Sequence, residues 1–480
     1  MTPRELASKA YYDAVVVGSG PNGLACAIVL AQAGLSVLVV EAQSTAGGGC
    51  RSLELTLPGF VNDICSSIYP LAIGSPYFRT LNLERFGLDW IQPDAPFAHP
   101  LEDGKYAILE RSVDETAENL GVDGAAYRRL MGGLLPNWDY IAPLLLEPWK
   151  MVKHPYELAH FGMKALMSAR TLASRKFKTN EAQTLFAGIA AHSGLRMDDP
   201  ASAAFALVLG LAGHAVGWPF PRGGAQSLTT ALVELFKSYG GEIILGCPVT
   251  DLDELPSSRL QMCDITPSQL LKIAGHRLPG SFIKQIEKYK YGPASFKIDW
   301  ALDAPVPWQS EHIKRAGTVH LGASMNEIAE SEAQVFAGEA PVTPYVLLAQ
   351  TSLFDASRAP ENQHTLWGYC HIPNGSTFDM TERIEDQIER FAPGFRKTII
   401  KRNALTPKEM EEKNANHVGG DINGGALSLG QLFTRPLIRP VPYSTPVKGL
   451  YLCSSSTPPG GGVHGMSGYY AAKCAIHNWR

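Results

Sequence analysis

The sequence YDAVVVGSGPNGLACAIVLAQAGLSVLVVEAQ, residues 12–43, decides the fold. It begins with a continuous apolar run, residues 14–17, which is typical of a strand buried on both faces. A glycine-rich turn follows, and then a segment of helical composition that ends near Gly34. Residues 36–41 form a second apolar run that ends in an acidic residue. The stretch therefore predicts a strand, a helix and a strand in the order of a Rossmann unit.

The glycine-rich turn of this unit indicates a dinucleotide site. In its GxGxxG spacing, Gly18 permits a tight turn, Gly20 lets the backbone approach a pyrophosphate, and Gly23 lets the helix pack against the strand. The carboxylate of Glu41 can accept hydrogen bonds from ribose hydroxyls and would repel a 2′-phosphate, which disfavours NADP. NAD and FAD both remain. The candidate contacts in this unit are Gly18, Ser19, Gly20, Pro21, Asn22, Gly23, Glu41 and Ala42.

A second group of glycines, Gly47 to Gly49 in EAQSTAGGGCRS (residues 41–52), follows the acidic residue. It resembles the second glycine signature of the large class of FAD-dependent oxidoreductases, in which FAD is bound in an extended form. The resemblance implies FAD rather than NAD, with Gly48 and Gly49 among its contacts. Arg51 has two interpretations: it meets a phosphate or the flavin edge, or it is a solvated loop arginine.

Further blocks resemble the phytoene desaturases and their relatives. WPFPRGGAQSLTTALVELFKSYGGEIILGCPV (residues 218–249) is similar to their P-x-GG, helix and GGEI strand segment, where the residue matching Val249 contacts the adenine. NHVGGDINGGALSLGQLFTRP (416–436) and GLYLCSSSTPPGGGVHG (449–465) resemble the phytoene desaturase-like flavoproteins. There the C-terminal strand and helix return to the N-terminal domain, which implies that residues 460–463 line the ribityl chain and the pyrimidine edge of the flavin. The contacts implied are Val249, Ser455, Gly461, Gly462 and Val463.

The fold class that these motifs imply is α/β. We expect a discontinuous Rossmann-type FAD-binding domain of the extended-FAD, glutathione reductase-like class, together with a substrate-binding domain built from a mixed sheet and helices. The flavin motifs are separated along the chain, so each domain must be assembled from several segments. The boundaries that we predict are 1–85, 215–285 and 440–480 for the FAD-binding domain, and 86–214 and 286–439 for the substrate-binding domain.

The sequence departs from the family pattern at two places. The segment after Val249 is short, so we expect the small antiparallel meander that usually follows there to be shortened or lost. The C-terminal motif reads STPPGGG where amine oxidases of the same superfamily carry an aromatic residue that faces the flavin, and Tyr469 is the first aromatic residue after it. An aromatic cage of the amine oxidase kind is therefore not expected.

Charge and cysteine content limit the expected partners. The formal net charge is -4, and no block of lysine or arginine is long enough to follow a phosphate backbone, which argues against nucleic acid. The eight cysteines include no CxxC motif and no Cys/His cluster. We therefore expect no metal site, and free thiols in a reducing compartment. The start, MTPRELASKAYY, lacks the apolar segment of a secretory signal, so a cytoplasmic location is expected.

Two segments bear on contact with membranes. Residues 201–220 are apolar but rich in glycine and alanine, and they predict a buried helix rather than a membrane span. Residues 136–178 mix tryptophan and leucine with lysine and arginine. This segment either makes a peripheral membrane contact or covers a core with a solvated basic face. The oligomeric state is left open.

The motifs together predict an FAD-dependent oxidoreductase that removes a hydride from a C–H bond of an apolar substrate, like a phytoene desaturase or dehydrogenase. Because no second dinucleotide fingerprint is found for NAD(P)H, a quinone or oxygen is the expected electron acceptor. A flavin-dependent polyene isomerase or saturase is one alternative, and a non-enzymatic lipid or prenyl binding protein on the same fold is another. His464 is the candidate catalytic residue; otherwise it is a loop histidine bonded to the backbone.

Overall fold

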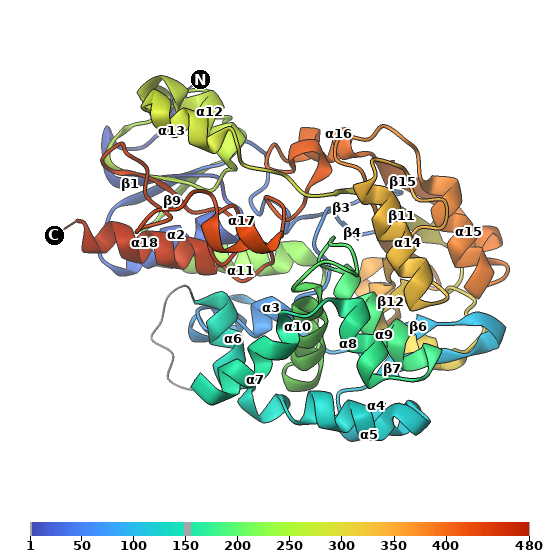
Figure 1. Ribbon diagram of the computed structural model, residues 1–480. Coiled ribbons are helices and arrows are strands. Elements are labelled where there is room, and N and C mark those ends of the chain that lie inside the picture. Colours follow the sequence, from blue (N-terminus) through green and yellow to red (C-terminus); the bar gives the residue numbers. More distant parts are fainter. Residues whose placement is uncertain (1, 148–154, 480) are drawn as a thin grey trace.

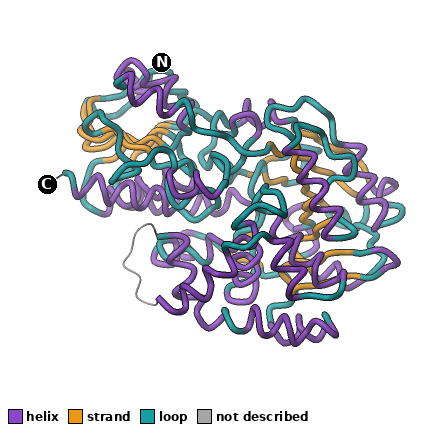
Figure 2. The backbone as a smooth tube through the Cα atoms, viewed as in Figure 1, coloured by secondary structure: helices purple, strands orange, loops and turns teal. Residues whose placement is uncertain are grey.

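The computed structural model describes residues 2–147 and 155–479. Its strands gather in two main sheets, which lie in different parts of the molecule (Figures 1 and 2). One sheet has five strands and the other has seven, and helices cover both. The predicted α/β class, with a Rossmann-like sheet and a second, mixed sheet, is confirmed.

The five-stranded sheet is parallel throughout. Its strand order is β16-β10-β1-β2-β9, so the first strand of the chain lies at its centre. The strands β1 and β2 belong to the stretch of residues 12–43 that predicts the Rossmann unit. The bounds are β1 (Tyr11–Val17), β2 (Val37–Val40), β9 (Glu242–Ile244), β10 (Ser257–Cys263) and β16 (Leu450–Leu452).

Helices cover this parallel sheet on both faces, which explains why its strands are apolar without alternation. On one face the side chains of Val16 and Val39 pack against α2 (Pro21–Gln32), α11 (Ala225–Ser238) and α18 (Met466–His477). On the other face Val15 and Leu38 pack against α12 (Pro267–Ala274) and α13 (Gly280–Ile286). The last helix, α18, lies beside the first long one, α2.

The seven-stranded sheet is mixed, with the order β15-β11-β14-β13-β12-β6-β7. Only the pair of β6 and β12 is parallel among its pairings. The bounds are β6 (Ala95–Pro100), β7 (Tyr106–Leu109), β11 (Ala294–Leu302), β12 (Ala316–Leu321), β13 (Val346–Ala349), β14 (His364–Ile372) and β15 (Ile399–Leu405). Two short pairs stand apart: β3 (Ser52–Leu53) with β4 (Asn62–Asp63), and β5 (Trp90–Ile91) with β8 (Phe220–Pro221).

One face of the mixed sheet packs against a group of helices, and the opposite face packs against α15 (Thr381–Phe391). The helical group holds the segment between β7 and β8 together with α14 (Met325–Phe336). It includes α4 (Val113–Asn119), α5 (Gly124–Tyr127), α6 (Trp138–Leu146), α7 (Pro155–Ala165), α8 (Ala169–Lys176), α9 (Asn180–Ala191) and α10 (Ser202–Ala215). The remaining helices are α1 (Pro3–Leu6), α3 (Pro70–Ile73), α16 (Pro407–Lys413) and α17 (Leu429–Thr434).

The segment after β9 lacks the small meander of the family pattern. Residues 245–256 contain a single 3-10 turn and no strand, so the meander is absent.

The two segments considered for membrane contact are mainly helical where they are described. The buried helix expected within residues 201–220 is α10, and none of the described helices is both long and apolar enough to cross a membrane. In the segment 136–178, Phe161 and Leu172 lie in the core beside α10, whereas Trp149, Lys150 and Lys153 fall outside the described residues. Membrane contact remains a prediction.

The strands of the two sheets fall within the predicted segments: those of the parallel sheet in 1–85, 215–285 and 440–480, and those of the mixed sheet in 86–214 and 286–439. The boundaries themselves remain predictions.

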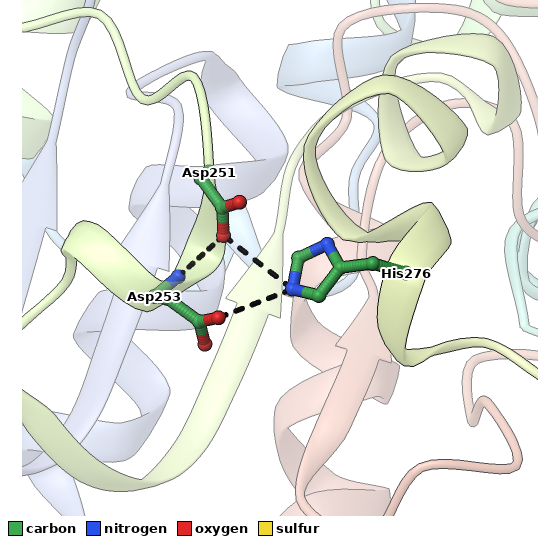
Figure 3. Close-up of side chains that lie close together, drawn as sticks. All are labelled: Asp251, Asp253 and His276. Carbon is green, nitrogen blue, oxygen red and sulfur yellow. Dashed lines mark hydrogen bonds and ion pairs between the residues drawn. The ribbon is translucent and has the colours of Figure 1, made fainter.

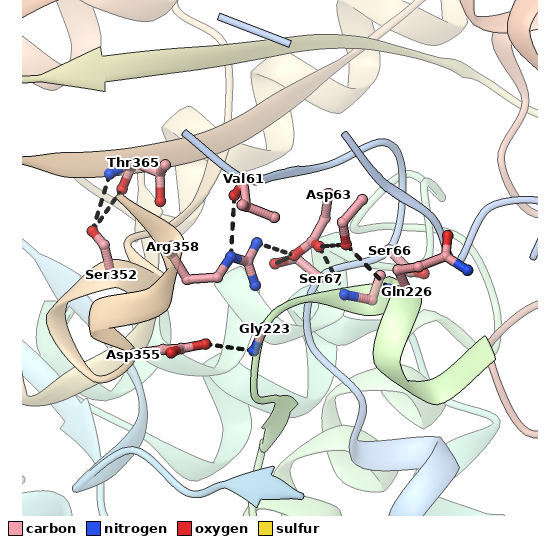
Figure 4. A network of polar contacts seen from close by, with 12 residues as sticks. Val61, Asp63, Ser66, Ser67, Gly223, Gln226, Ser352, Asp355, Arg358 and Thr365 are labelled. Atoms are coloured by element: carbon pink, nitrogen blue, oxygen red, sulfur yellow. Dashed lines mark hydrogen bonds and ion pairs between the residues drawn. The ribbon is translucent and has the colours of Figure 1, made fainter. Parts of the chain in front are cut away.

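A buried network of charges joins the two parts (Figure 4). The Arg358 guanidinium donates to a carboxylate oxygen of Asp63 at 2.8 Å, and both side chains are at most 2% exposed. Asp63 also accepts hydrogen bonds from Ser52, from Ser67 and from the backbone N–H of Ala225, at the start of α11. Burial raises the pKa of Asp63, but the charge of Arg358 and these hydrogen bonds outweigh that effect, and the pKa is lowered.

Candidate functional site

A cavity of about 670 Å³ extends from the edge of the parallel sheet to the mixed sheet. At the sheet edge it begins where the strands end: Gly18 follows β1, Glu41 follows β2 and Asp264 follows β10. The carboxyl ends of the strands are where open parallel α/β sheets bind their ligands. The volume is in the range of cavities that hold ligands of the size of drugs and cofactors.

Three glycine-rich segments meet at this end of the cavity. A Cβ on Gly48 would lie 3.1 Å from the Cα of Gly20, so the first two segments touch each other. Gly461 comes from the third segment, far along the chain. The predicted contacts found in the lining are Gly18, Ser19, Gly20, Pro21, Asn22, Glu41, Ala42, Gly48, Gly49, Arg51, Val249, Ser455, Gly461, Gly462 and Val463.

Gly23 is the predicted contact that is not in this lining. It lies in the first turn of α2, and a Cβ there would come within 2.2 Å of the carbonyl oxygen of Gly18. This contact agrees with the packing role expected of the third glycine, between helix and strand.

The Glu41 carboxylate fixes the glycine-rich turn. One of its oxygens accepts from the backbone N–H and the hydroxyl of Ser19, at 2.9 and 2.6 Å, and the other accepts from the N–H of Gln43 at 2.8 Å. The Ser19 hydroxyl oxygen accepts in turn from the N–H of Gly47 at 3.2 Å, which ties the second glycine segment to the first. Glu41 therefore organises the turn and also lines the cavity.

Arg51 is buried, with 4% of its surface exposed, so it is not a solvated loop arginine. Its Nε donates to the carbonyl of Gly48 at 2.8 Å, and a terminal nitrogen donates to the carbonyl of Lys413 at 3.1 Å. Burial lowers its pKa. The remaining interpretation, contact with a phosphate or with the flavin edge, agrees with its place in the cavity lining.

Asp264 is a lining residue that the sequence analysis missed. Its carboxylate accepts from the N–H of Gly23 at 2.9 Å, at the positive end of the α2 dipole. Burial raises its pKa to about 7, and the nearby charge of Glu41 contributes in the same direction. A signal was present in the sequence, because an acidic residue directly follows the apolar end of β10.

His464 is not among the described residues that line the cavity. Its Nδ1 accepts from the N–H of Met466 at 3.0 Å, and its own carbonyl accepts from Ser75. Burial lowers the pKa of His464 to about 4, so it is neutral at physiological pH. These contacts favour the interpretation of a loop histidine bonded to the backbone, and its catalytic role stays an untested prediction.

The other end of the cavity is lined largely by aromatic and aliphatic side chains. Trp367, Tyr369 and His371 alternate along β14 and share one face of the mixed sheet. Trp218 and residues of α10 lie in the same lining. Aromatic residues are thus present, although the C-terminal motif carries none before Tyr469, because β14, the start of α10 and Trp218, which follows α10, supply them.

His192 and His371 line this wall, and His320 lies next to His192; these histidines differ in their charge state. The Nε2 atoms of His192 and His320 are 2.9 Å apart, and burial lowers the pKa of His192 to about 3 and that of His320 well below its usual value. Burial also lowers the pKa of His371, but the charge of Glu332 and the hydrogen bond that the ring donates to that carboxylate outweigh it, and the pKa is raised. Only neutral imidazole is expected for the first pair.

The glycine-rich end fits a dinucleotide. Asn22 lies in the first turn of α2, lines the cavity, and its Oδ1 is a buried oxygen without a hydrogen-bond partner among the described residues. The backbone N–H groups of a helix start suit a pyrophosphate, and the guanidinium of Arg51 adds positive charge. The three glycine segments leave room for a ligand to lie against the backbone.

A second cluster of polar side chains lies at the surface (Figure 3). The His276 Nε2 is 3.2 Å from a carboxylate oxygen of Asp253 and 3.6 Å from one of Asp251. Arg277 also contacts Asp253, which supplies a positive charge to the same carboxylate. The three side chains are partly solvent-exposed and already paired, so the cluster gives no argument for a ligand.

Comparison with known proteins agrees with this geometry. Residues 16–82 match the family model of the NAD(P)-binding Rossmann-like domain. The chain is 26% identical to pyridine nucleotide-disulfide oxidoreductase domain-containing protein 2 of Mus musculus, over 97% of this chain and 93% of that protein. It is 23% identical to phytoene desaturase (lycopene-forming) of Pantoea ananas, over 96% of this chain and 98% of that protein.

Solved structures share the fold. An oxidoreductase from Methanosarcina mazei superposes with a TM-score of 0.66 at 17% identity, covering 97% of this chain and 99% of that one. The match to the phytoene desaturase over 96% of this chain confirms, at the scale of the whole chain, the resemblance that the motifs indicate.

Proposed function

Because the chain is an enzyme of the FAD-dependent oxidoreductase superfamily, with FAD as its cofactor, we propose that it removes a hydride from a C–H bond of a largely apolar substrate. A quinone or oxygen then accepts the electrons. FAD, when bound, supplies the hydride acceptor. The protein residues bind and orient both molecules and exclude water from the space between them.

One observation carries this proposal: the glycine-rich end and the aromatic end belong to a single continuous cavity. The first suits a dinucleotide, and the second suits an apolar molecule because Trp218, Trp367 and Leu347 line it. A substrate in the aromatic end would lie beside the part of the cofactor held nearest to the mixed sheet.

We further propose that FAD lies extended, as in the glutathione reductase-like class. Val249 would contact the adenine, Glu41 the ribose, and the start of α2 the pyrophosphate. Gly461 and Gly462 would hold the pyrimidine edge, and the nearby start of α18 favours negative charge on it. We also propose a cytoplasmic location, with peripheral membrane contact through the segment 136–178 as the alternative to a solvated basic face.

The test is the reduction of the bound flavin under anaerobic conditions. The FAD-loaded protein is mixed rapidly with NADH, with NADPH, and separately with phytoene, limonene, decanol and cyclohexylamine. We expect the nicotinamides to bleach the flavin slowly or not at all, since no second dinucleotide fingerprint is found in the sequence. At least one apolar compound should bleach it within turnover time.

Three outcomes would contradict the proposal in different ways. Fast bleaching by NADPH would overturn the direction of electron flow. Turnover of a polyene only after artificial reduction of the flavin would indicate an isomerase or saturase. Purified protein that neither contains FAD nor takes it up would favour a binding protein without redox chemistry.

A further inference from the structure

The aromatic end of the cavity contains a histidine paired with a buried carboxylate. The Nδ1 of His371, on β14, is 2.9 Å from Oε1 and 3.1 Å from Oε2 of Glu332, on α14. The exposed fraction is 6% for the histidine side chain and 0% for the glutamate side chain. Burying a carboxylate without a partner costs free energy. The hydrogen bond from His371 offsets this cost, so the two residues form one hydrogen-bonded unit.

The position of His371 leaves its second nitrogen available to the cavity. The ring lines the cavity while its Nδ1 is held by Glu332. No hydrogen bond to its Nε2 is found among the described residues. With Nδ1 carrying a hydrogen toward the carboxylate, the neutral ring has Nε2 as a free acceptor, which is the arrangement of a histidine general base.

Other polar groups near His371 do not compete for this role. The rings of Tyr345 and Tyr369 lie with their centroids 6.3 and 5.7 Å away, and burial raises the pKa of both hydroxyls well above the neutral range. Ser295 is its register partner on β11 and does not titrate. His192, at the end of α9, is neutral. Lys297 and Asp299 follow Ser295 on the same face of β11, but they are buried and paired with each other. Glu332 is the charged group bonded to His371 within the described part of the chain.

We propose that Nε2 of His371 accepts the proton that the substrate loses as a hydride leaves the neighbouring carbon, and that Glu332 is the positioning residue. The inference rests on the proposed function. The bonds balance: the C–H bond breaks with both electrons going to the bound FAD, and an adjacent O–H, N–H or C–H bond breaks with its proton going to Nε2. Its electron pair forms the new C=O, C=N or C=C bond, and imidazolium beside Glu332 results.

The proposal narrows the class of substrate. A base fixed close to the bond that loses the proton takes it up directly, without a water molecule between the aromatic walls. A substrate with a hydroxyl or an amine on the oxidised carbon would place that group at Nε2 of His371 and its apolar body against Trp367 and Tyr369. Such a substrate, an alcohol or amine with a hydrocarbon body, is favoured over an unactivated hydrocarbon.

The first test compares variants of the FAD-loaded enzyme in anaerobic flavin reduction by decanol, cyclohexylamine and limonene. In His371→Gln the rate should fall about 10²- to 10⁴-fold with FAD content unchanged. His364→Gln is the matched control, because His364 lies on the same strand but is not among the described residues that line the cavity. Its rate should equal that of the wild type. An equally fast His371→Gln enzyme would overturn the proposal.

The pH dependence separates positioning from a merely structural role. The pKa of His371 is raised above its ordinary value of 6.5, so the base form, and the rate, should increase as the pH rises through that higher value. In Glu332→Gln only burial acts on the pKa of His371, and it lowers that pKa. The inflection of the rate with pH should therefore move to lower pH. The loss of rate should be smaller than in His371→Gln. Glu332→Asp should restore the inflection toward that of the wild type.

The second test needs no substrate. Proton and nitrogen shifts of labelled histidines in the FAD-loaded protein, assigned through His371→Gln, report the tautomer and the pKa directly. We expect the Nδ1–H tautomer for His371 and a lower pKa in Glu332→Gln. An Nε2–H tautomer, or a pKa that does not respond to Glu332→Gln, would overturn the inference. Absence of FAD from the purified protein would instead overturn the proposed function, so the two failures are distinguishable.

Discussion

Glu41 occupies a position where one carboxylate serves two purposes. It accepts the hydrogen bonds that close the turn around Ser19, and it lines the cavity where a ribose is proposed to lie. Hydrogen bonds to a charged acceptor contribute more than neutral ones.

For Glu41→Ala we expect FAD affinity to fall about tenfold to a hundredfold, because the ribose hydroxyls and the Ser19 N–H lose a charged acceptor. The measurement is fluorescence titration of the apo-protein with FAD, with circular dichroism as the check on folding. Glu234→Ala, at an exposed position on α11, is the control. Unchanged affinity in a folded Glu41→Ala protein would contradict the assignment.

Asp264 makes protein stability and ligand binding at the same end of the cavity depend on pH. Its folded-state pKa of about 7 is above its ordinary value of 3.8, so the folded protein retains a proton that the unfolded chain releases. The stability contributed by the neutral form is complete below pH 3.8 and is lost as the pH rises through about 7. Above that pH the carboxylate is charged and repels an anionic ligand.

We therefore expect FAD to bind the wild type several-fold more weakly at pH 8.5 than at pH 6, whereas Asp264→Asn should bind almost equally at both values. Asparagine keeps an oxygen for the N–H of Gly23 and carries no charge. Titration of apo-protein with FAD across this range gives the answer. The same slope in both proteins would show that Asp264 does not face the pyrophosphate.

Among the secondary-structure elements, the turn that carries Arg358 is held against the parallel-sheet part of the molecule at three points. Besides the ion pair with Asp63, Nε of Arg358 donates to the carbonyl of Val61 at 3.1 Å, and the carboxylate of Asp355 accepts from the N–H of Gly223 (Figure 4). These contacts fix the segment before β14 relative to the start of α11.

Removing the guanidinium leaves a buried, unpaired carboxylate, so Arg358→Met should lower the free energy of unfolding by about 3–5 kcal/mol. Urea denaturation followed by circular dichroism measures this change. Arg222→Met removes an arginine from the exposed pair with Asp89, and it should leave the denaturation midpoint nearly unchanged. Equal effects of the two substitutions would contradict a special role for the buried pair.

The elements of the parallel sheet could be predicted from the sequence because their signals are local. The apolar runs of β1 and β2, the glycine turn and Glu41 all lie within residues 12–43. The mixed sheet was expected only as a part of the substrate-binding domain implied by the family resemblance, without the bounds or the order of its strands.

The wall of the substrate end could not be predicted in the same way. The sequence of β14, HTLWGYCHI, is buried on both faces, so its pattern does not show which side chains face a cavity. The partner of His371 is Glu332, which lies on a different element 39 positions away. Only the packing of α14 against β14 brings them together.

At the scale of the whole molecule, the parallel sheet depends on the end of the chain. The strand β16 pairs with β10, and α18 packs against α2, whose first turn faces the cavity. A Cβ on Gly468 of α18 would come within 1.8 Å of the carbonyl of Asn22, so the two helices are in close contact.

A chain that ends before Lys448 lacks β16, α18 and the third glycine segment, and we expect it to be insoluble or unable to retain FAD. A chain that ends at Asn478 keeps both elements and should retain FAD. Soluble yield and the flavin spectrum after purification measure the difference. Full FAD content in the shorter chain would show that the C-terminal segment is dispensable.

The separation between β10 and β16 also affects how the chain emerges during synthesis. Until about 190 further residues have been translated, β10 has an unpaired apolar edge. At ordinary translation rates this interval is roughly 10 to 40 s, long enough for edges of two nascent chains to meet. A ribosome that pauses between these strands therefore prolongs the exposure. Synonymous codons that slow translation in this interval should lower the soluble yield without changing a single residue of the folded enzyme.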